Sequence, residues 1–405
     1  MTIEGDIVGR IIIFTGKGGV GKTSVAAAHA LNSASEGRNT LLVSTDMAHN
    51  LGDIFQVKSG KEIVRVTERL DILELDPDWL MKQEFPNINR ALGLLFGKKG
   101  VSITSLDDNF IIPGFENLFS LLKIRDLYNS GAYDRIIVDC APTGETLSLL
   151  KLPELLAWYL EKFFPVGKFM IRVFSPVSKL KYKVTLPDRK AMNEIEQMHG
   201  QLLLLQDLLR DPDICSIRLV GIPERMVVEE TKRNYMYMNL YGYQVDGVFI
   251  NRILPEDTGN DFMNHWHQIQ KQYIEELERV FYDIPITRII WYPEEVRGVN
   301  AIDKMRWEAL DIPDLFEVRV HTETEVYTET ENGYMLTMHL PGIEASRVKV
   351  AKNGLDMDIT VNHYNRCLPL PNTLRSAEIK KVIAKEETLQ ILFDLGEKDG
   401  KDYER

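Results

Sequence analysis

The chain has 405 residues, of which 44% are hydrophobic and 27% charged, and these proportions are typical of a folded globular protein. Its 60 acidic and 48 basic residues give a net charge of -12, which argues against a general nucleic-acid-binding protein, because such proteins carry a basic excess. Three widely spaced cysteines, Cys140, Cys215 and Cys367, argue against a disulfide framework and against a cysteine-rich zinc module.

The beginning of the chain predicts a cytoplasmic protein. Residues 1–6 are polar and acidic, whereas a secretory signal requires basic residues followed by an apolar stretch. The apolar segment at residues 11–14 is short and ends in glycines. No run reaches the roughly 18 apolar residues of a membrane-spanning helix. We therefore expect a soluble protein.

Apolar segments alternate with helix-like segments and predict an α/β fold. Residues 11–14 read as a strand buried on both faces, followed by a glycine-rich loop and an alanine-rich helix at 23–35. Further strands are expected at 39–44, 70–75, 136–139, 215–222 and 247–251. Strands that alternate with helices are typical of βαβ units, so we predict a mostly parallel sheet with helices on both faces.

Glycines mark a phosphate-binding loop after the first predicted strand. The pattern G-x-x-x-x-G-K-[ST] lets backbone N–H groups and a helix N-terminus converge on phosphate oxygens. We predict that Lys22 contacts the β- and γ-phosphates and that Thr23 holds Mg²⁺. A glycine-rich turn without a ligand is the alternative. The predicted ATP-binding residues of the loop are Gly16, Lys17, Gly18, Gly19, Val20, Gly21, Lys22, Thr23 and Ser24.

Two aspartates follow predicted strands at the edge where ligands meet open α/β sheets. Asp46 is placed to orient or deprotonate the water that attacks a γ-phosphate, although a helix N-cap is an alternative role. Asp139 ends an apolar strand, as a Walker-B carboxylate does, and is predicted to hold Mg²⁺ through water. Gly144 follows and is predicted to donate its N–H to the γ-phosphate. These three are the expected switch residues.

Two long segments, 76–130 and 147–210, are apolar and helix-like and predict a helical subdomain beside the sheet. Within them, residues 115–127 and 152–174 carry more leucine and phenylalanine than one buried stripe of a surface helix needs. Core packing with a dimer seam is one interpretation. The other is a groove that binds an apolar protein segment.

Asn251 ends the last predicted strand of the sheet. A side-chain amide both donates and accepts hydrogen bonds, so it suits the edge of an adenine base. An asparagine that forms a turn is the alternative. The sequence therefore predicts that Asn251 binds the base of ATP.

The pattern changes near Pro313. Alternating apolar and polar residues with turn signals at 334–340, 348–350, 355–361 and 389–395 predict a small antiparallel β-sandwich. The expected domains are thus an ATPase domain at 1–312, a sandwich at 317–396 and a charged tail at 397–405.

Together, the motifs resemble the deviant phosphate-loop ATPases of the arsenical-pump and tail-anchored-protein targeting family over nearly all of residues 9–310. In the first switch, residues 44–53, Met47 and Asn50 stand where the family usually has proline and serine. In the second switch, residues 139–146, Cys140 and Glu145 stand where it has threonine and histidine. The glutamate is the larger departure and concerns the coupling between nucleotide and helices.

The resemblance implies a homodimeric ATPase that uses ATP and Mg²⁺ as cofactors. The extra loop lysine, Lys17, is implied to reach the nucleotide of the other subunit, so Lys17, Lys22 and Asp46 are the expected catalytic residues. Asn251 matches the adenine-reading asparagine of the family, and residues 293–298 resemble the segment that closes over the base.

Metal-binding features of known family members are missing. Targeting ATPases of the eukaryotic type share zinc through a CxxC, but the corresponding residues 261–267 contain no cysteine, so no zinc is expected. His265 and His267 are either an alternative metal clamp or part of an exposed helix face. The cysteine cluster of arsenite-activated pump subunits is also missing. Those subunits carry two phosphate loops in tandem and this chain carries one, so a homodimer must supply the second loop.

The resemblance implies that ATP binding and hydrolysis open and close a hydrophobic client groove during the targeting of tail-anchored or other membrane proteins. The implied partners are a hydrophobic or transmembrane protein segment as client, a second subunit and a membrane receptor, with no nucleic acid. One alternative function is an arsenite-transport motor. Another is an ATP-bound holdase with negligible turnover.

The C-terminal region resembles the small heat-shock-protein (α-crystallin) domain. Residues 340–343 read Leu-Pro-Gly-Ile, and residues 366–371 and 389–392 match further parts of that pattern, with Thr388 where glycine is usual. The fold class expected for the whole chain is a P-loop α/β domain followed by an α-crystallin-like sandwich. A sheet edge offered to a client and a purely structural appendage are both compatible with this part.

Overall fold

The computed structural model describes residues 9–46, 51–89, 116–174, 189–256, 259–318, 320, 323–385 and 387–395. The replacements at Met47 and Asn50 and the charged tail at 397–405 lie outside these ranges. Among the helices of these ranges, none combines the length and the apolar character of a membrane span.

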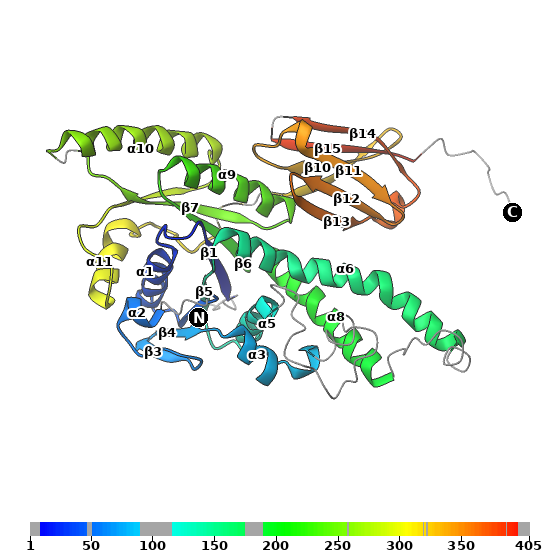
Figure 1. Cartoon of the computed structure of the whole chain (residues 1–405), viewed down its shortest axis with the longest axis horizontal. Coiled ribbons are helices and arrows are strands. Elements are labelled where there is room, and N and C mark those ends of the chain that lie inside the picture. Colours follow the sequence, from blue (N-terminus) through cyan, green and yellow to red (C-terminus); the bar gives the residue numbers. More distant parts are fainter. Residues whose placement is uncertain are drawn as a thin grey trace, which may run out of the picture.

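The first part of the chain is built on an eight-stranded sheet with the order β3-β4-β2-β5-β1-β6-β7-β8 (Figure 1). Neighbouring strands are parallel, except that β3 is antiparallel to β4. The strands are β1 (Arg10–Thr15), β2 (Thr40–Ser44), β3 (Val64–Thr67), β4 (Leu70–Glu74), β5 (Arg135–Asp139), β6 (Cys215–Gly221), β7 (Val245–Ile253) and β8 (Ile286–Ile290). The predicted α/β fold with a mostly parallel sheet is confirmed.

Helices cover both faces of the sheet, because alternate residues of its central strands enter different cores. Ile11 and Ile13 of β1 belong to one core, and Ile12 and Phe14 belong to the other. The second core is closed by α1 (Lys22–Ser35), α2 (Leu51–Phe55) and α11 (Val299–Ala309). The first core is closed mainly by α3 (Pro77–Gln83), α5 (Glu116–Asn129), α6 (Thr143–Phe174), α8 (Arg189–Arg210), α9 (Arg225–Leu240) and α10 (Asp261–Val280).

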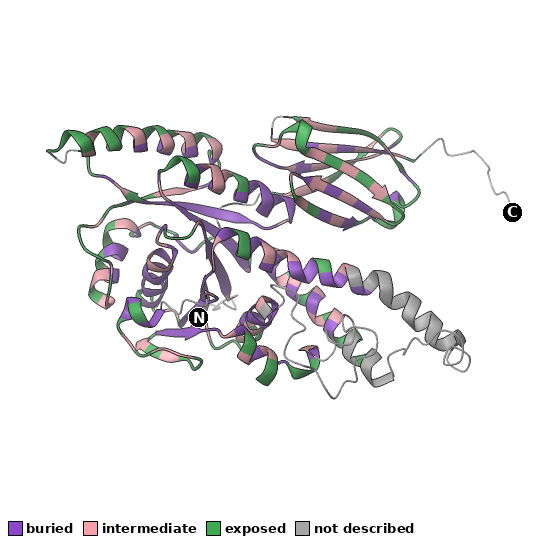
Figure 2. Cartoon of the chain, viewed as in Figure 1, coloured by how far each residue is buried: buried purple, intermediate pink, exposed green. Residues whose placement is uncertain are grey.

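The apolar residues of the two predicted helical segments form core where the structure describes them. Five residues of α5, namely Leu118, Phe119, Leu121, Leu122 and Ile124, are buried, as are Leu152, Leu156 and Leu160 of α6 (Figure 2). Leu155 is 48% exposed on the same helix. Phe115 and the side chains of α6 beyond Leu160 lie outside the described part. The described apolar residues other than Leu155 therefore form core, while the dimer seam and the groove both stay predictions.

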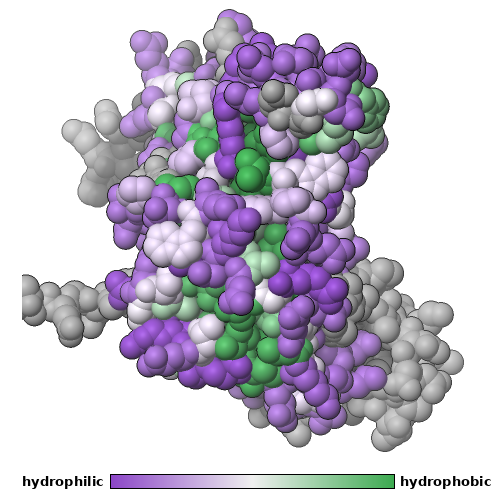
Figure 3. All heavy atoms as spheres, turned by 90° about the vertical axis from the view of Figure 1, so that its left-hand side faces the viewer, coloured by the Kyte–Doolittle hydropathy of each residue, from purple (hydrophilic) through white to green (hydrophobic). Residues whose placement is uncertain are grey.

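Large apolar side chains are exposed on α10 and α11. Phe262, Trp266 and Trp307 are 66%, 40% and 59% exposed. Figure 3 looks onto the side of the molecule where these two helices lie, and hydrophobic residues form separate clusters there among hydrophilic ones. Exposed aromatic groups of this kind are available for contact with another molecule.

The C-terminal part is an antiparallel β-sandwich, as predicted. One sheet has the strand order β14-β15-β10-β9, and the other has the order β11-β12-β13. Alternate residues point inward, so that Leu336, Met338, Ile359, Leu389 and Ile391 are buried. The strands are β9 (Glu325–Thr330), β10 (Gly333–His339), β11 (Val348–Asn353), β12 (Asp356–Val361), β13 (Tyr364–Pro369), β14 (Glu378–Lys385) and β15 (Thr388–Asp394).

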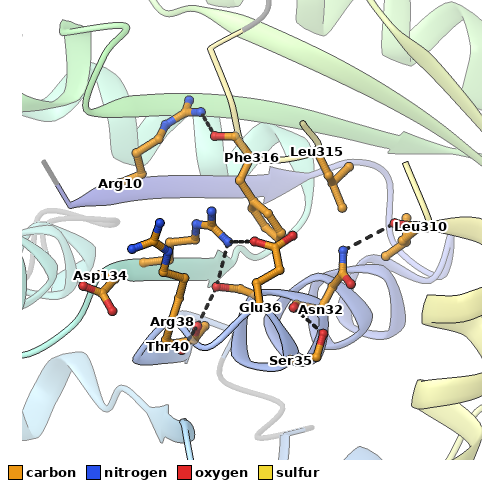
Figure 4. A network of polar contacts seen from close by, with 12 residues as sticks. Arg10, Asn32, Ser35, Glu36, Arg38, Thr40, Asp134, Leu310, Leu315 and Phe316 are labelled. Carbon is orange, nitrogen blue, oxygen red and sulfur yellow. Dashed lines mark hydrogen bonds and ion pairs between the residues drawn. The ribbon is translucent and has the colours of Figure 1, made fainter. Parts of the chain in front are cut away.

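The segment between α11 and β9 is fixed to the sheet rather than running free (Figure 4). A guanidinium N–H of Arg10 donates to the carbonyl of Phe316, and the amide of Asn32 donates to the carbonyl of Leu310 at 3.3 Å. The Phe316 ring is 3% exposed and lies 3.9 Å from the guanidinium of Arg135. These contacts hold residues 310–316, which precede the sandwich, against β1, β5 and α1.

The sandwich is also joined to α6 and α9 through the buried Arg366 of β13. Its side chain is 1% exposed and pairs with Glu154 of α6 at 3.2 Å. A second N–H donates to the carbonyl of Leu240, at the end of α9, at 2.7 Å. Nearby, the rings of Tyr237 and Tyr364 lie 4.0 Å apart. The sandwich core is therefore continuous with one core of the sheet.

Candidate active site

The phosphate loop joins β1 to α1 and requires glycine at two positions. At Gly16, a Cβ atom would lie 2.0 Å from the carbonyl oxygen of Val220. At Gly21, where φ is +93°, it would lie 2.3 Å from the amide nitrogen of Asn251. Lys22 is the first residue of α1, so the loop ends at the positive end of that helix dipole.

A cavity of about 720 Å³ opens beside this loop, within the size range of ligand pockets. Of the predicted site residues, its lining includes Gly18, Gly19, Gly21, Lys22, Thr23, Ser24, Asp46 and Asn251. The structure thus brings together loop, switch and base-pocket residues that are up to 233 positions apart between Gly18 and Asn251. The other predicted residues, Gly16, Lys17, Val20, Asp139 and Gly144, are not part of the lining.

Thr23, which lines the cavity, contacts Asp139, which lies outside the lining. The hydroxyl of Thr23 donates to one carboxylate oxygen of Asp139 at 2.7 Å. The other oxygen of Asp139 is buried and has no hydrogen-bond partner among the residues that the structure describes. Burial raises the pKa of Asp139 to about 7, and the charge of Asp46 adds to this, while the Thr23 hydrogen bond and the charge of Lys22 oppose it. A hydroxyl and a carboxylate with an unused oxygen fit Mg²⁺, which prefers oxygen ligands.

We expect Asp139→Asn to stabilise the protein in the absence of metal and nucleotide. Because the pKa in the folded chain lies above the ordinary value of 3.8, ionisation costs stability as the pH rises from about 4 to about 7. At about 1.36 kcal/mol per pKa unit, the ionised carboxylate lowers the free energy of unfolding by at most about 4 kcal/mol. Because the variant buries an unpaired amide, the expected gain in this free energy is about 1–2 kcal/mol.

The test is thermal unfolding of both proteins in EDTA at several pH values. The variant should melt higher at pH 8, and the difference should vanish towards pH 4. A wild-type protein that melts higher than the variant at pH 8 would contradict the raised pKa of Asp139.

Asp46 lies on the cavity wall beyond β2, and its N–H donates to the hydroxyl of Ser44 at 3.2 Å. A carboxylate oxygen of Glu74, at the end of β4, accepts hydrogen bonds from the N–H groups of Leu51 at 2.9 Å and Gly52 at 3.1 Å. Glu74 therefore fixes the start of α2. The sequence interpretation missed this residue, although an acid at the end of a buried strand is a usable signal.

Asn251 both braces the loop and faces the cavity. Its amide donates to the carbonyl of Val20 at 2.9 Å, and its oxygen accepts the N–H of Arg252 at 2.9 Å. Beyond these bonds among the described residues, Asn251 has one amide N–H and one lone pair for a ligand. Arg252 has a φ of +59°, so the chain turns directly after Asn251. Trp291 and Tyr292, which the sequence interpretation did not single out, also line the cavity.

A phosphate loop between the first strand and helix, with carboxylates at the same edge of a mostly parallel sheet, defines a P-loop nucleoside triphosphatase. The chain belongs to the anion-transporting ATPase family, whose model matches residues 9–310, and is therefore an ATPase. An "HSP20-like domain found in ArsA" matches residues 331–393, in agreement with the sandwich.

Relatives extend over one or both parts of the chain. A "Putative arsenical pump-driving ATPase" of Chlorobaculum tepidum is 33% identical over 397 residues, covering 97% of this chain and 98% of the relative. A "Putative arsenical pump-driving ATPase 1" of Aquifex aeolicus is 31% identical over 394 residues, covering 94% of this chain and 99% of the relative. "ATPase get3" of Botryotinia fuckeliana is 30% identical over 305 residues, 73% of this chain and 88% of the relative.

Proposed function

We propose that this chain is a Mg²⁺-dependent homodimeric ATPase in which ATP binding and hydrolysis open and close a hydrophobic groove for a membrane-protein client. Lys17, Lys22 and Asp46 act on the γ-phosphate and its attacking water. Thr23 binds Mg²⁺ directly, and Asp139 holds it through water. When bound, Mg²⁺ neutralises charge that develops on the phosphate oxygens.

The observation that carries this proposal is the start of α6. This helix begins at Thr143, within the predicted second switch, and continues into the helical layer. The hydroxyl of Thr146 accepts from that of Thr15 at 3.0 Å and donates to the carbonyl of Ala141 at 2.7 Å. A change at the γ-phosphate that moves Gly144 therefore acts on one end of a helix that reaches the proposed groove.

The test is ATP-dependent capture of a reporter protein with one C-terminal transmembrane segment. Purified Asp46→Asn protein, loaded with Mg-ATP, should retain the reporter, whereas ADP-loaded protein should release it. A reporter with lysines in place of alternate apolar residues is the matched control. Equal recovery of both reporters, or equal recovery with ATP and ADP, contradicts the client groove.

A homodimer is supported by the single phosphate loop of the chain and by its exposed aromatic groups. Phe262, Trp266, Trp291 and Trp307 are between 40% and 66% exposed on α10, on α11 and beyond β8. Large exposed apolar side chains are typical of protein contact surfaces. We further propose a cytoplasmic location and a membrane receptor that accepts the client.

An anion-transport motor is the second candidate, because relatives that match almost the whole chain carry the description of an arsenical pump-driving ATPase. Stimulation of ATP turnover by antimonite would favour it. Soft metalloids require accessible thiolates. Cys140 and Cys215 are buried, and burial raises the pKa of both thiols to about 12, so these two residues do not favour a metalloid site.

A further inference from the structure

Glu230 of α9 faces the phosphate loop and joins it to two helices. A carboxylate oxygen of Glu230 lies 3.9 Å from the ammonium of Lys17. The other oxygen accepts a hydrogen bond from the hydroxyl of Thr143, the first residue of α6. One carboxylate therefore contacts the loop lysine and the start of the proposed switch helix.

The ion pair is accessible and exchangeable. The side chains of Lys17 and Glu230 are 38% and 27% exposed, and a partly exposed ion pair contributes little free energy. The adjacent Glu229 is engaged elsewhere, with Lys232 at 2.6 Å. Glu230 thus forms a weak contact with Lys17, which a more highly charged phosphate within reach of that lysine displaces.

We propose that Glu230 is a positioning residue that holds Lys17 in the nucleotide-free subunit and competes with the γ-phosphate for its ammonium. This inference rests on the proposed role of Lys17 as a phosphate-contacting lysine. ATP carries the γ-phosphate and ADP does not, so Glu230 weakens the binding of ATP but not that of ADP. When Lys17 is released, the carboxylate of Glu230 keeps its contact with Thr143 at the start of α6. Glu230 therefore links the position of Lys17 to α6.

The variant Glu230→Gln tests the competition, because glutamine keeps an oxygen for Thr143 but loses the charge. We expect full-length protein with Mg²⁺ to bind a slowly hydrolysed ATP analogue two- to fivefold more tightly, the range for a partly exposed ion pair. Affinity for ADP should stay unchanged, and the gain for the ATP analogue should shrink at high salt. The matched control, Glu229→Gln, should alter neither affinity.

Lys17→Ala separates the competition from a structural effect. In that background, Glu230→Gln should have no effect on the affinity for the ATP analogue, because the contested ammonium is absent. Equal changes for ATP analogue and ADP, no change for either, or a persisting change without Lys17 each overturn the inference. The readout is nucleotide affinity alone, so a failure to capture client would refute the proposed function without touching this result.

Discussion

Asp46→Asn is expected to lower ATP turnover by more than about 100-fold while ATP still binds, the scale of losing a general base. The carboxylate lies on the wall of the nucleotide cavity beyond β2, on the same side as the phosphate loop. Asparagine preserves size and polarity but neither accepts the proton of the attacking water nor orients it as a carboxylate does. Phosphate release and equilibrium nucleotide binding, measured on the same preparation, separate the two effects.

Asp213→Asn is the matched control for this experiment. Asp213 is exposed and precedes β6. Since Ile11, near the start of β1, pairs with Cys215, Asp213 lies near the amino ends of the strands, whereas the phosphate loop follows their carboxyl ends. Its replacement should leave turnover unchanged. If the Asp46 variant hydrolyses ATP at the wild-type rate, Asp46 is not the general base and the proposed mechanism fails.

The sequence predicts buried strands well and edge strands poorly. β1, β2, β4, β5, β6 and β7 are apolar runs buried almost throughout, and all six were expected. β3, β8, β9, β13 and β14, each at an edge of its sheet, were missed. β14 (Glu378–Lys385) mixes lysines with apolar residues and is largely exposed, because an edge strand pairs on one side and faces solvent. Hydrophobic periodicity is informative only where a face is buried.

In the candidate site, the sequence predicts contiguous motifs but not contacts between residues that are far apart in the chain. The phosphate loop is a contiguous motif that sequence reads directly, and the structure places most of it on the cavity wall. Glu74 acts on residues 22 and 23 positions away, Glu230 reaches a lysine of the loop, and Arg366 meets Glu154 at a separation of 212 residues. No local pattern encodes such contacts, because the fold of several segments creates them.

Arg366→Ala is expected to destabilise the chain by about 3–5 kcal/mol, the cost of breaking a buried ion pair by removing one partner. Burial alone would lower the pKa of Arg366, but Glu154 and Glu325 outweigh it and keep the guanidinium charged. Removal leaves the buried carboxylate of Glu154 with Arg210, at 2.7 Å, and leaves the carbonyl of Leu240 without this donor. Thermal and denaturant unfolding measure the loss.

The matched control is Arg347→Ala, because that arginine pairs with Glu344 at the surface, where both side chains are more than half exposed. It should change stability by less than about 0.5 kcal/mol. A neutral set, Arg366→Met with Glu325→Gln, should recover much of the loss, since Glu154 then keeps Arg210 as its charged partner at 2.7 Å. A loss below about 1 kcal/mol in Arg366→Ala would mean that the sandwich is held by its apolar contacts with α9 rather than by this arginine. In that case α6 would be joined to the sandwich by its other contacts, such as the hydrogen bond that Trp158 donates to Asp356 at 3.1 Å.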